Sequence, residues 1–187
     1  MQAIDLTDHF LNPRNVGDAS EPSFAGRAVS FVCGASARLS IQIDELQNIS
    51  QAKFKAAGCE VLVGVLSVLT ERVRGMATAE AAAIAQSPGE LVDVSEDRHH
   101  CVQLACDALL SAVRKFSDAA RSEWNGDEAL ICTCFFVSEQ TIEREIQTKG
   151  LTTVREVTAA CNAGGGCGSC QPLIVELLLY RRDAETD

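Results

Sequence analysis

Two pairs of closely spaced cysteines near the C-terminal end of the chain constrain its fold more than any other feature. Cys132 and Cys134 form a C-x-C pair, and Cys167 and Cys170 form a C-x-x-C pair after an insert long enough for helices. Four thiolates brought together in this way make a soft-metal site, which suits either a structural zinc or an iron–sulfur cluster. The spacing of the cysteines alone leaves both metals open.

Glycines surround the second cysteine pair, in the run Ala163-Gly164-Gly165-Gly166-Cys167-Gly168-Ser169-Cys170. Glycine lets a backbone wrap closely around a bulky inorganic centre and aim N–H groups at its sulfur atoms, which a zinc ion needs less. Pro172 fits the first turn of a following helix. This position places the Cys170 thiol near a helix N-terminus, where we expect the helix dipole to favour the thiolate.

Composition and charge limit the classes of partner. The 187 residues are 47% hydrophobic and 22% charged, which is typical of a globular protein with one large domain or two small ones. A formal net charge of −10 opposes binding to nucleic acid or to anionic membranes, and suits docking to a basic protein. Residues 1–6 do not resemble a secretory signal, and the longest apolar-rich run, Val61 to Leu69, is too short to cross a bilayer. We therefore expect a cytoplasmic protein, in which nine cysteines indicate metal or thiol chemistry rather than disulfides.

The N-terminal part of the chain predicts strands followed by helices. Alternating apolar residues indicate strands, and apolar residues at helical spacing follow them. The expected elements are a short helix ending near residue 11, strands within 27–44 and 49–56, and helices over 58–75, 79–86 and 99–120. Strands that form a small antiparallel sheet packed with helices make an α+β domain.

A polar, turn-prone stretch at 122–129 is the expected linker between a first domain at 1–121 and a second at 130–187. We expect the second domain to be small and all-helical. A domain of this size has a thin core, so bound metal should supply much of its folding free energy.

Cap residues mark the helices of the second domain. Ser138 can cap a helix that Gly150 ends, and Thr153 with Glu156 fits a capping box for the next helix.

Three further cysteines lie at predicted turns or helix starts in the first domain. At such positions the pKa of a thiol tends to be lowered and access is good, so Cys33, Cys59 and Cys101 could converge as exposed thiolates. Each could instead pack as a small apolar residue. For Cys106 and Cys161 we expect that second role.

The segment from Ile131 to Leu178 resembles the bacterioferritin-associated-ferredoxin type of [2Fe-2S] domain (BFD-like), in the form found at the centre of NifU proteins. The shared features are the C-x-C pair, Leu151-Thr152-Thr153-Val154, Glu156-Val157-Thr158 and the run AGGGCGSC. This resemblance favours an iron–sulfur cluster over zinc. It implies that Cys132, Cys134, Cys167 and Cys170 hold a permanent [2Fe-2S] cluster.

The segment from Leu6 to about Phe116 resembles the IscU/NifU N-terminal scaffold domain. The shared features are Asp8-His9-Phe10-Leu11-Asn12-Pro13-Arg14-Asn15-Val16-Gly17, Cys33-Gly34, Lys53-Phe54-Lys55, Gly58-Cys59, Thr70-Glu71, Glu80-Ala81 and His100-Cys101 with Leu104-Ala105. The resemblance implies that Cys33, Cys59 and Cys101 receive sulfur from a cysteine desulfurase, build a transient cluster with iron, and pass it to recipient apo iron–sulfur proteins. It favours Cys101 as the first persulfide acceptor. It also implies a scaffold rather than an enzyme, a homodimer, and a NifU protein without the C-terminal NifU domain of longer members.

The chain departs from the scaffold family near the first and the third of these cysteines, Cys33 and Cys101. Ala35 stands where the family has an aspartate that can share coordination of iron or zinc, so we expect altered cluster release. The stretch 94–98 lacks the prolines of the chaperone-recognition motif found in housekeeping scaffolds. His100, next to Cys101, is a candidate for the fourth ligand.

Two functions follow from these patterns. The first is an iron–sulfur cluster assembly scaffold whose permanent [2Fe-2S] cluster gives redox support. The alternative is a ferredoxin-like electron-transfer or redox-regulatory protein whose scaffold domain is degenerate.

Overall fold

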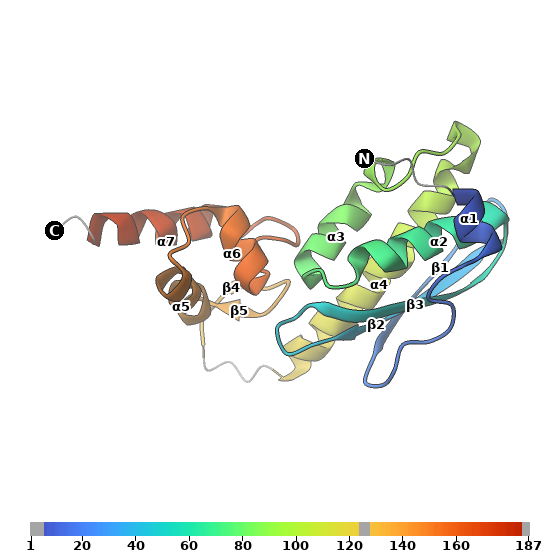
Figure 1. Cartoon of the computed structure of the whole chain (residues 1–187). Helices are drawn as coiled ribbons and strands as arrows, with labels where there is room; N and C mark the ends of the chain where they lie inside the picture. Colours follow the sequence, from blue (N-terminus) through green and yellow to red (C-terminus); the bar gives the residue numbers. More distant parts are fainter. Residues whose placement is uncertain (1–5, 124–127, 185–187) are drawn as a thin grey trace. The chain divides into compact units, whose positions relative to one another are not determined.

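The computed structural model describes residues 6–123 and 128–184, and the chain divides into two compact units, Met1–Phe116 and Ser117–Asp187 (Figure 1). The division falls inside the long helix α4 (His99–Glu123). The expected linker at 122–129 overlaps the last turn of α4, and its residues 124–127 lie outside the described residues. The domain limits at 121 and 130 stay predictions.

The first unit contains the predicted three-stranded antiparallel sheet, in the order β1-β2-β3. Its strands are β1 (Phe24–Val29), β2 (Ser36–Ile43) and β3 (Ile49–Ala57). Leu39 and Phe54 are paired across β2 and β3 and are both buried, so they mark the inner face of the sheet. The α+β prediction is confirmed for this unit.

The helices of the first unit also follow the predicted pattern. They are α1 (Leu6–Leu11), α2 (Glu60–Val73), α3 (Thr78–Gln86) and α4, with short 3₁₀ turns η1 (Pro88–Glu90) and η2 (Glu96–Arg98) before α4. Leu62, Leu66 and Leu69 recur at helical spacing on α2 and are all buried. Apolar residues at this spacing give α2 one continuous face for the core.

Helix α4 lies directly against β1 at Gly26. A Cβ atom added to Gly26 would overlap the carbonyl oxygen of Ala108 and the backbone nitrogen of Ala112 on α4. Beside this contact, the rings of Phe24 and Phe116 meet edge to face with their centroids 5.4 Å apart. The missing side chain at Gly26 therefore sets how closely the helix and the sheet can approach.

The second unit is helical, with one addition that corrects the all-helical prediction. A short antiparallel hairpin of β4 (Leu130–Cys132) and β5 (Val137–Ser138) precedes the helices α5 (Glu139–Lys149), α6 (Val154–Cys161) and α7 (Gln171–Ala184). The hairpin reverses at Phe136, which has a positive φ of 55°. Two strands this short leave no alternating pattern in the sequence, which is why helix and strand periodicity missed them.

The predicted caps are present in the second unit. The Ser138 hydroxyl accepts a hydrogen bond from the backbone N–H of Thr141 at 3.3 Å. Gly150 ends α5 in the left-handed conformation, with φ 63°. Thr153 and Glu156 form both bonds of the capping box at the start of α6. These caps fix where α5 and α6 begin, while Ile142, Ile146, Val157 and Ile174 form the small core between the helices.

Within residues 6–123 and 128–184, no helix is both long enough and apolar enough to span a lipid bilayer.

The contact at Gly26 gives a first prediction. Gly26→Ala should lower the free energy of unfolding by about 1–3 kcal/mol, because the new methyl group must push the backbone of α4 away from the sheet. The matched control is Gly89→Ala, since an added Cβ there would meet no atom within 4 Å. Urea unfolding monitored by circular dichroism measures both variants. A Gly26→Ala midpoint equal to that of the control would contradict the close contact.

Candidate metal centres

The first candidate centre lies in the first unit, where three separate elements bring their cysteines to one end of the sheet. Cys33 is in the loop between β1 and β2, Cys59 directly precedes α2, and Cys101 is in the first turn of α4. The sulfur atoms of Cys59 and Cys101 are 3.4 Å apart. Cys33 is near enough for its charge to raise the pKa of Cys101. The structure thus brings together thiols that are far apart in the sequence.

Cys59 and Cys101 lie in contact but differ in acidity. Burial raises the pKa of Cys59, but the N–H groups of Leu62 and Val61 at the start of α2, together with the Cys101 thiol, outweigh burial and leave this pKa lowered. Burial, followed by the neighbouring Cys59, raises the pKa of Cys101 to about 12. Cys59 is therefore the more acidic of the two thiols.

The three thiols were expected to be accessible to solvent, and only some of them are. Cys33 is exposed and Cys59 is half-buried, but Cys101 is 0% exposed. Cys101 lies at a helix start, as the sequence predicted. The prediction that this position makes the thiol accessible to solvent and lowers its pKa is wrong. The reason is that the Cys101 side chain lies on the buried side of the first turn of α4, where desolvation disfavours a thiolate.

His100 lies beside the pair, with its Nε2 atom 3.4 Å from the sulfur of Cys101. The neighbouring His99 is exposed, and its Nε2 is 3.1 Å from the carbonyl oxygen of Val94. Of the two histidines, His100 is thus the one that could complete a set of ligands.

Ala35 occupies the position where an aspartate was expected, and it is only 3% exposed. A Cβ atom added to Gly58 would be 2.7 Å from the Cβ of Ala35. The side chain at position 35 therefore lies against the turn that carries Cys59. No carboxylate enters the centre from this position.

Ser30 organises the loop that carries Cys33. Its hydroxyl accepts weak hydrogen bonds from the N–H groups of Val32 at 3.3 Å and Cys33 at 3.4 Å, and it lies 3.4 Å from the Cys33 sulfur. The backbone of Ser30 also bonds to Gly34 and Ala35, which closes the loop. A serine three residues before the cysteine was the available sequence signal, and sequence reasoning missed it.

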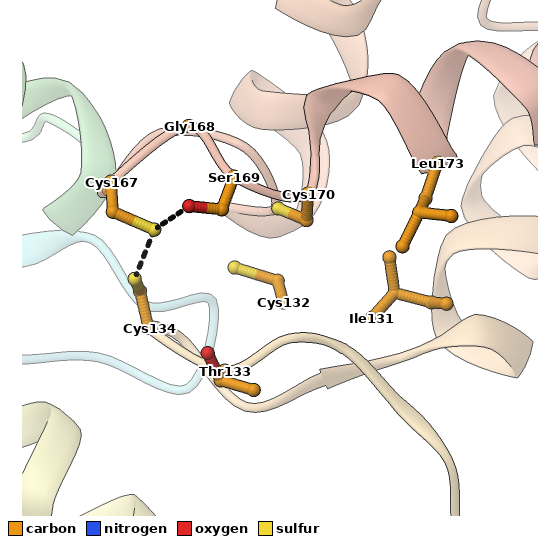
Figure 2. Close-up of a pocket in the computed structure, with 10 residues that line it drawn as sticks. Ile131, Cys132, Thr133, Cys134, Cys167, Gly168, Ser169, Cys170 and Leu173 are labelled. Carbon is orange, nitrogen blue, oxygen red and sulfur yellow. Dashed lines mark hydrogen bonds between the residues drawn. The ribbon is translucent and has the colours of Figure 1, made fainter.

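The second candidate centre is a cavity of about 100 Å³ in the second unit, lined by all four cysteines of the C-x-C and C-x-x-C pairs. Figure 2 shows Cys132 and Cys134 from the hairpin facing Cys167 and Cys170 from the glycine-rich loop. The sulfur atoms of Cys134 and Cys167 are 3.4 Å apart. Cys132 and Cys170 are buried, whereas Cys167 is exposed.

The four thiols have different acidities. The Ser169 hydroxyl and the Ser169 N–H lower the pKa of Cys167 to about 7. Burial raises the pKa of Cys134, and burial together with Cys132 raises that of Cys170 to about 11. The sequence analysis expected the thiolate to be favoured at Cys170. Desolvation outweighs the helix N-terminus there, and Cys167 is the acidic thiol instead.

The donor set and the backbone both fit an iron–sulfur cluster. Four thiols line the cavity beside the hydroxyl groups of Thr133 and Ser169, and its described lining contains no histidine or acidic side chain, so the strong metal donors are all soft. A Cβ atom added to Gly166 would be 2.8 Å from the Cβ and 3.0 Å from the sulfur of Cys134, so only glycine allows this approach. The backbone N–H of Gly164 acts on the Cys170 thiol, as expected of a loop that surrounds sulfur ligands. The residues of the site therefore fit the [2Fe-2S] cluster that the BFD-like resemblance implies.

The two remaining cysteines lie outside both centres. Cys106 is fully buried on α4, and burial raises its pKa to about 11. Cys161 donates from its sulfur to the carbonyl oxygen of Val157 at 3.3 Å.

Across the part of the chain that the structure describes, no three histidine, cysteine or acidic side chains are already arranged as the ligands of a metal ion.

Comparisons with known proteins match two different family models to the parts of the chain that carry the two centres. The model of the NifU-like N terminal domain matches residues 3–123, and that of the BFD-like [2Fe-2S] binding domain matches residues 130–179. The nitrogen fixation protein NifU of Trichormus azollae is 31% identical over 189 residues, covering 93% of this chain and 63% of that protein. The iron–sulfur cluster assembly scaffold protein IscU of Azotobacter vinelandii is 37% identical over 115 residues, covering 59% of this chain and 90% of that protein.

A crystal structure of the N-terminal part of a nitrogen-fixing NifU-like protein from Brucella abortus has a TM-score of 0.46 at 17% identity, covering 61% of this chain and 99% of that chain. The chain spans 63% of the length of the Trichormus NifU protein. Because the NifU-like N terminal domain model matches more than half of the chain, and this match includes all three cysteines of the first centre, the protein belongs to the NifU-like N terminal domain family.

Proposed function

We propose that this protein is an iron–sulfur cluster assembly scaffold with two thiol centres of different purpose. One observation carries the proposal: each unit brings its own set of cysteines together, and the two sets differ in completeness. The second unit gathers four thiols around one cavity, while the first gathers two thiols in contact, an exposed thiol and a histidine. A complete thiolate set retains metal, and an incomplete, partly open set suits a cargo that must leave.

In the second unit, Cys132, Cys134, Cys167 and Cys170 would hold a permanent [2Fe-2S] cluster, which supplies a one-electron redox centre when bound. Two features of the chain support this role. Burial of Cys132 and Cys170 excludes water from one side of the cavity. At the exposed side, the Ser169 hydroxyl lies 3.2 Å from the Cys167 sulfur, where it can donate a hydrogen bond to the thiolate.

In the first unit, the cluster is cargo that is built and released. Sulfur would arrive from a cysteine desulfurase, and iron would join it on Cys33, Cys59 and Cys101 before transfer to recipient apo iron–sulfur proteins. The lowered pKa of Cys59 supports this role, because the thiolate is the metal-binding and nucleophilic form of cysteine. His100 is the proposed fourth ligand. The same thiols could hold iron or zinc before sulfur arrives.

Ala35 favours the second candidate function, a ferredoxin-like electron-transfer or redox-regulatory protein with a degenerate scaffold domain. The buried methyl group of Ala35 removes a carboxylate from the assembly centre. Such a protein would keep the four-cysteine centre and lose sulfur transfer.

The cellular compartment and the oligomeric state of the protein are also proposals. Free cysteines throughout the described chain support a reducing compartment, for which we propose the cytoplasm. A homodimer is proposed from the family resemblance.

The ligand assignment in the second unit gives a second prediction. Cys167→Ala should abolish the visible absorption of the anaerobically purified protein and remove about two iron atoms per chain, because one ligand of a [2Fe-2S] cluster is lost. Cys161→Ala is the control, since that cysteine belongs to the same unit but does not line the cavity. Absorption spectra, iron content and acid-labile sulfide measure the result. Full iron and colour in Cys167→Ala would show that the assignment is wrong.

The missing carboxylate gives a third prediction. Ala35→Asp should speed transfer of a cluster from the first unit to an apo-ferredoxin by about tenfold, because a carboxylate is a more labile ligand than the groups now present. Ala35→Asn is the matched control, with similar volume and no charge. The proteins are loaded with iron and a cysteine desulfurase, and acceptor maturation is followed over time.

The same experiment separates the two candidate functions. Equal transfer rates at equal loading would remove Ala35 as a controlling residue and leave the scaffold function intact. If neither the natural chain nor the Ala35→Asp variant gains iron and sulfide on the first unit, the electron-transfer function is favoured instead.

A further inference from the structure

The loop that presents Cys33 has an exposed apolar tip. Phe31 is 99% exposed and Val32 is 86% exposed, and both directly precede the exposed cysteine. Single exposed apolar residues are common on protein surfaces. Two consecutive ones, held beside a thiol in a closed loop, form a compact anchor of the kind that dominates protein interfaces.

Three cationic side chains lie side by side across the sheet, near the strand ends that the Cys33 loop joins. Arg27 is directly opposite Arg38, and Arg38 is directly opposite Lys55, so the three side chains share one face of the sheet. Asp18 pairs with both Arg38 and Lys55. Within the described residues, Arg27 has no ion-pair partner. Like charges directly opposite each other destabilise a sheet, so the row carries a cost that folding alone does not require.

This cationic row lies on the face of the sheet away from α4. Gly26 and Leu39, the neighbours of Arg27 and Arg38, are paired on the opposite face, where Gly26 contacts the helix. Val29 is exposed, and it lies two residues from Arg27 on the same strand face. The apolar tip and the cationic row are therefore parts of one continuous surface at the end of the sheet that holds Cys33.

We propose that this surface, made of Phe31, Val32, Arg27, Arg38 and Lys55, docks the sulfur-donor protein, and that Cys33 is the thiol through which sulfur enters. The inference rests on the proposed scaffold function. The partner is a persulfide-bearing protein with acidic residues around an apolar recess. Charge complementarity supports this choice, because a cationic face on a chain of net charge −10 is selective for an acidic surface.

The order of exposure of the thiols identifies the entry point. Cys33 is exposed, Cys59 is half-buried and Cys101 is buried, so a protein-bound persulfide reaches Cys33 first. This differs from the sequence-based expectation that Cys101 is the first acceptor. A single sulfur atom needs only one accessible thiol, whereas release of a finished cluster needs access to all its ligands. The surface therefore fits a sulfur donor better than a cluster recipient.

The transfer is a thiol–persulfide exchange that balances without any oxidant. The Cys33 thiolate attacks the outer sulfur of the donor's persulfide, and a new S–S bond forms at Cys33. The S–S bond of the donor breaks, and its cysteine leaves as a thiolate that takes up the proton released by Cys33. The sulfur then lies on the β1–β2 loop, from which the Cys59–Cys101 pair can accept it by the same exchange.

Direct binding of the full-length protein to a cysteine desulfurase tests the docking surface. Phe31→Ala/Val32→Ala and Arg27→Glu should each weaken binding by about tenfold or more, and rising salt should weaken binding of the natural chain. The matched controls are Leu46→Ala, an exposed leucine in the turn between β2 and β3, and Arg114→Glu, an exposed arginine on α4. Affinities equal to those of the controls would overturn the proposal.

Two loading experiments separate this inference from the function on which it rests. With iron and inorganic sulfide alone, the variants should load the first unit as the natural chain does. With the desulfurase and L-cysteine, they should load at least about tenfold more slowly, and the first persulfide found by mass spectrometry should be on Cys33. Failure of the natural chain to load with inorganic sulfide would contradict the scaffold function, while the binding experiment still decides the docking surface. Slow handover to apo-ferredoxin with normal desulfurase loading would assign the surface to recipients and overturn the proposal.

Discussion

The close approach of α4 to β1 at Gly26 is the constraint on which the first thiol centre depends. Cys101 begins α4, and Cys33 follows β1, so the distance between them is set by how these two elements lie against each other. Without a side chain at Gly26, the backbone of α4 can contact the strand directly. Phe24 and Phe116 hold the same pair of elements together farther along. The thiols of the first centre are thereby positioned by a strand and helices of the fold rather than by loops alone.

Both thiol centres combine one cysteine of lowered pKa with a neighbour of raised pKa. In the first unit, Cys59 has a lowered pKa and Cys101 a raised one. In the second, the pKa of Cys167 is lowered while that of Cys170 is raised. The acidic member is in each case more exposed than its neighbour and receives hydrogen bonds from backbone N–H groups. Because neighbouring thiolates repel one another, a cation bound among them would favour loss of the remaining protons.

Much of the fold could be predicted from the sequence, because long periodic segments and helix caps are local signals. The strands around Leu39, the helix beginning after Cys59 and the capping box at Thr153 were all expected. The β4–β5 hairpin was not, since two very short strands show no periodicity. The acidity of the individual thiols could not be predicted from the sequence either. Burial of Cys101 depends on residues distant in the sequence, and the Ser169 contact with Cys167 depends on the path of the glycine loop.

The cationic row across β1, β2 and β3 has a consequence for how the molecule meets any charged neighbour. A chain with an excess of ten negative charges repels acidic surfaces on average, yet this row presents the opposite sign over one face of the sheet. The resulting field exerts a torque as well as a force. An approaching acidic body is turned toward the sheet before contact, so rotation during diffusion, rather than repeated collision, selects the productive orientation.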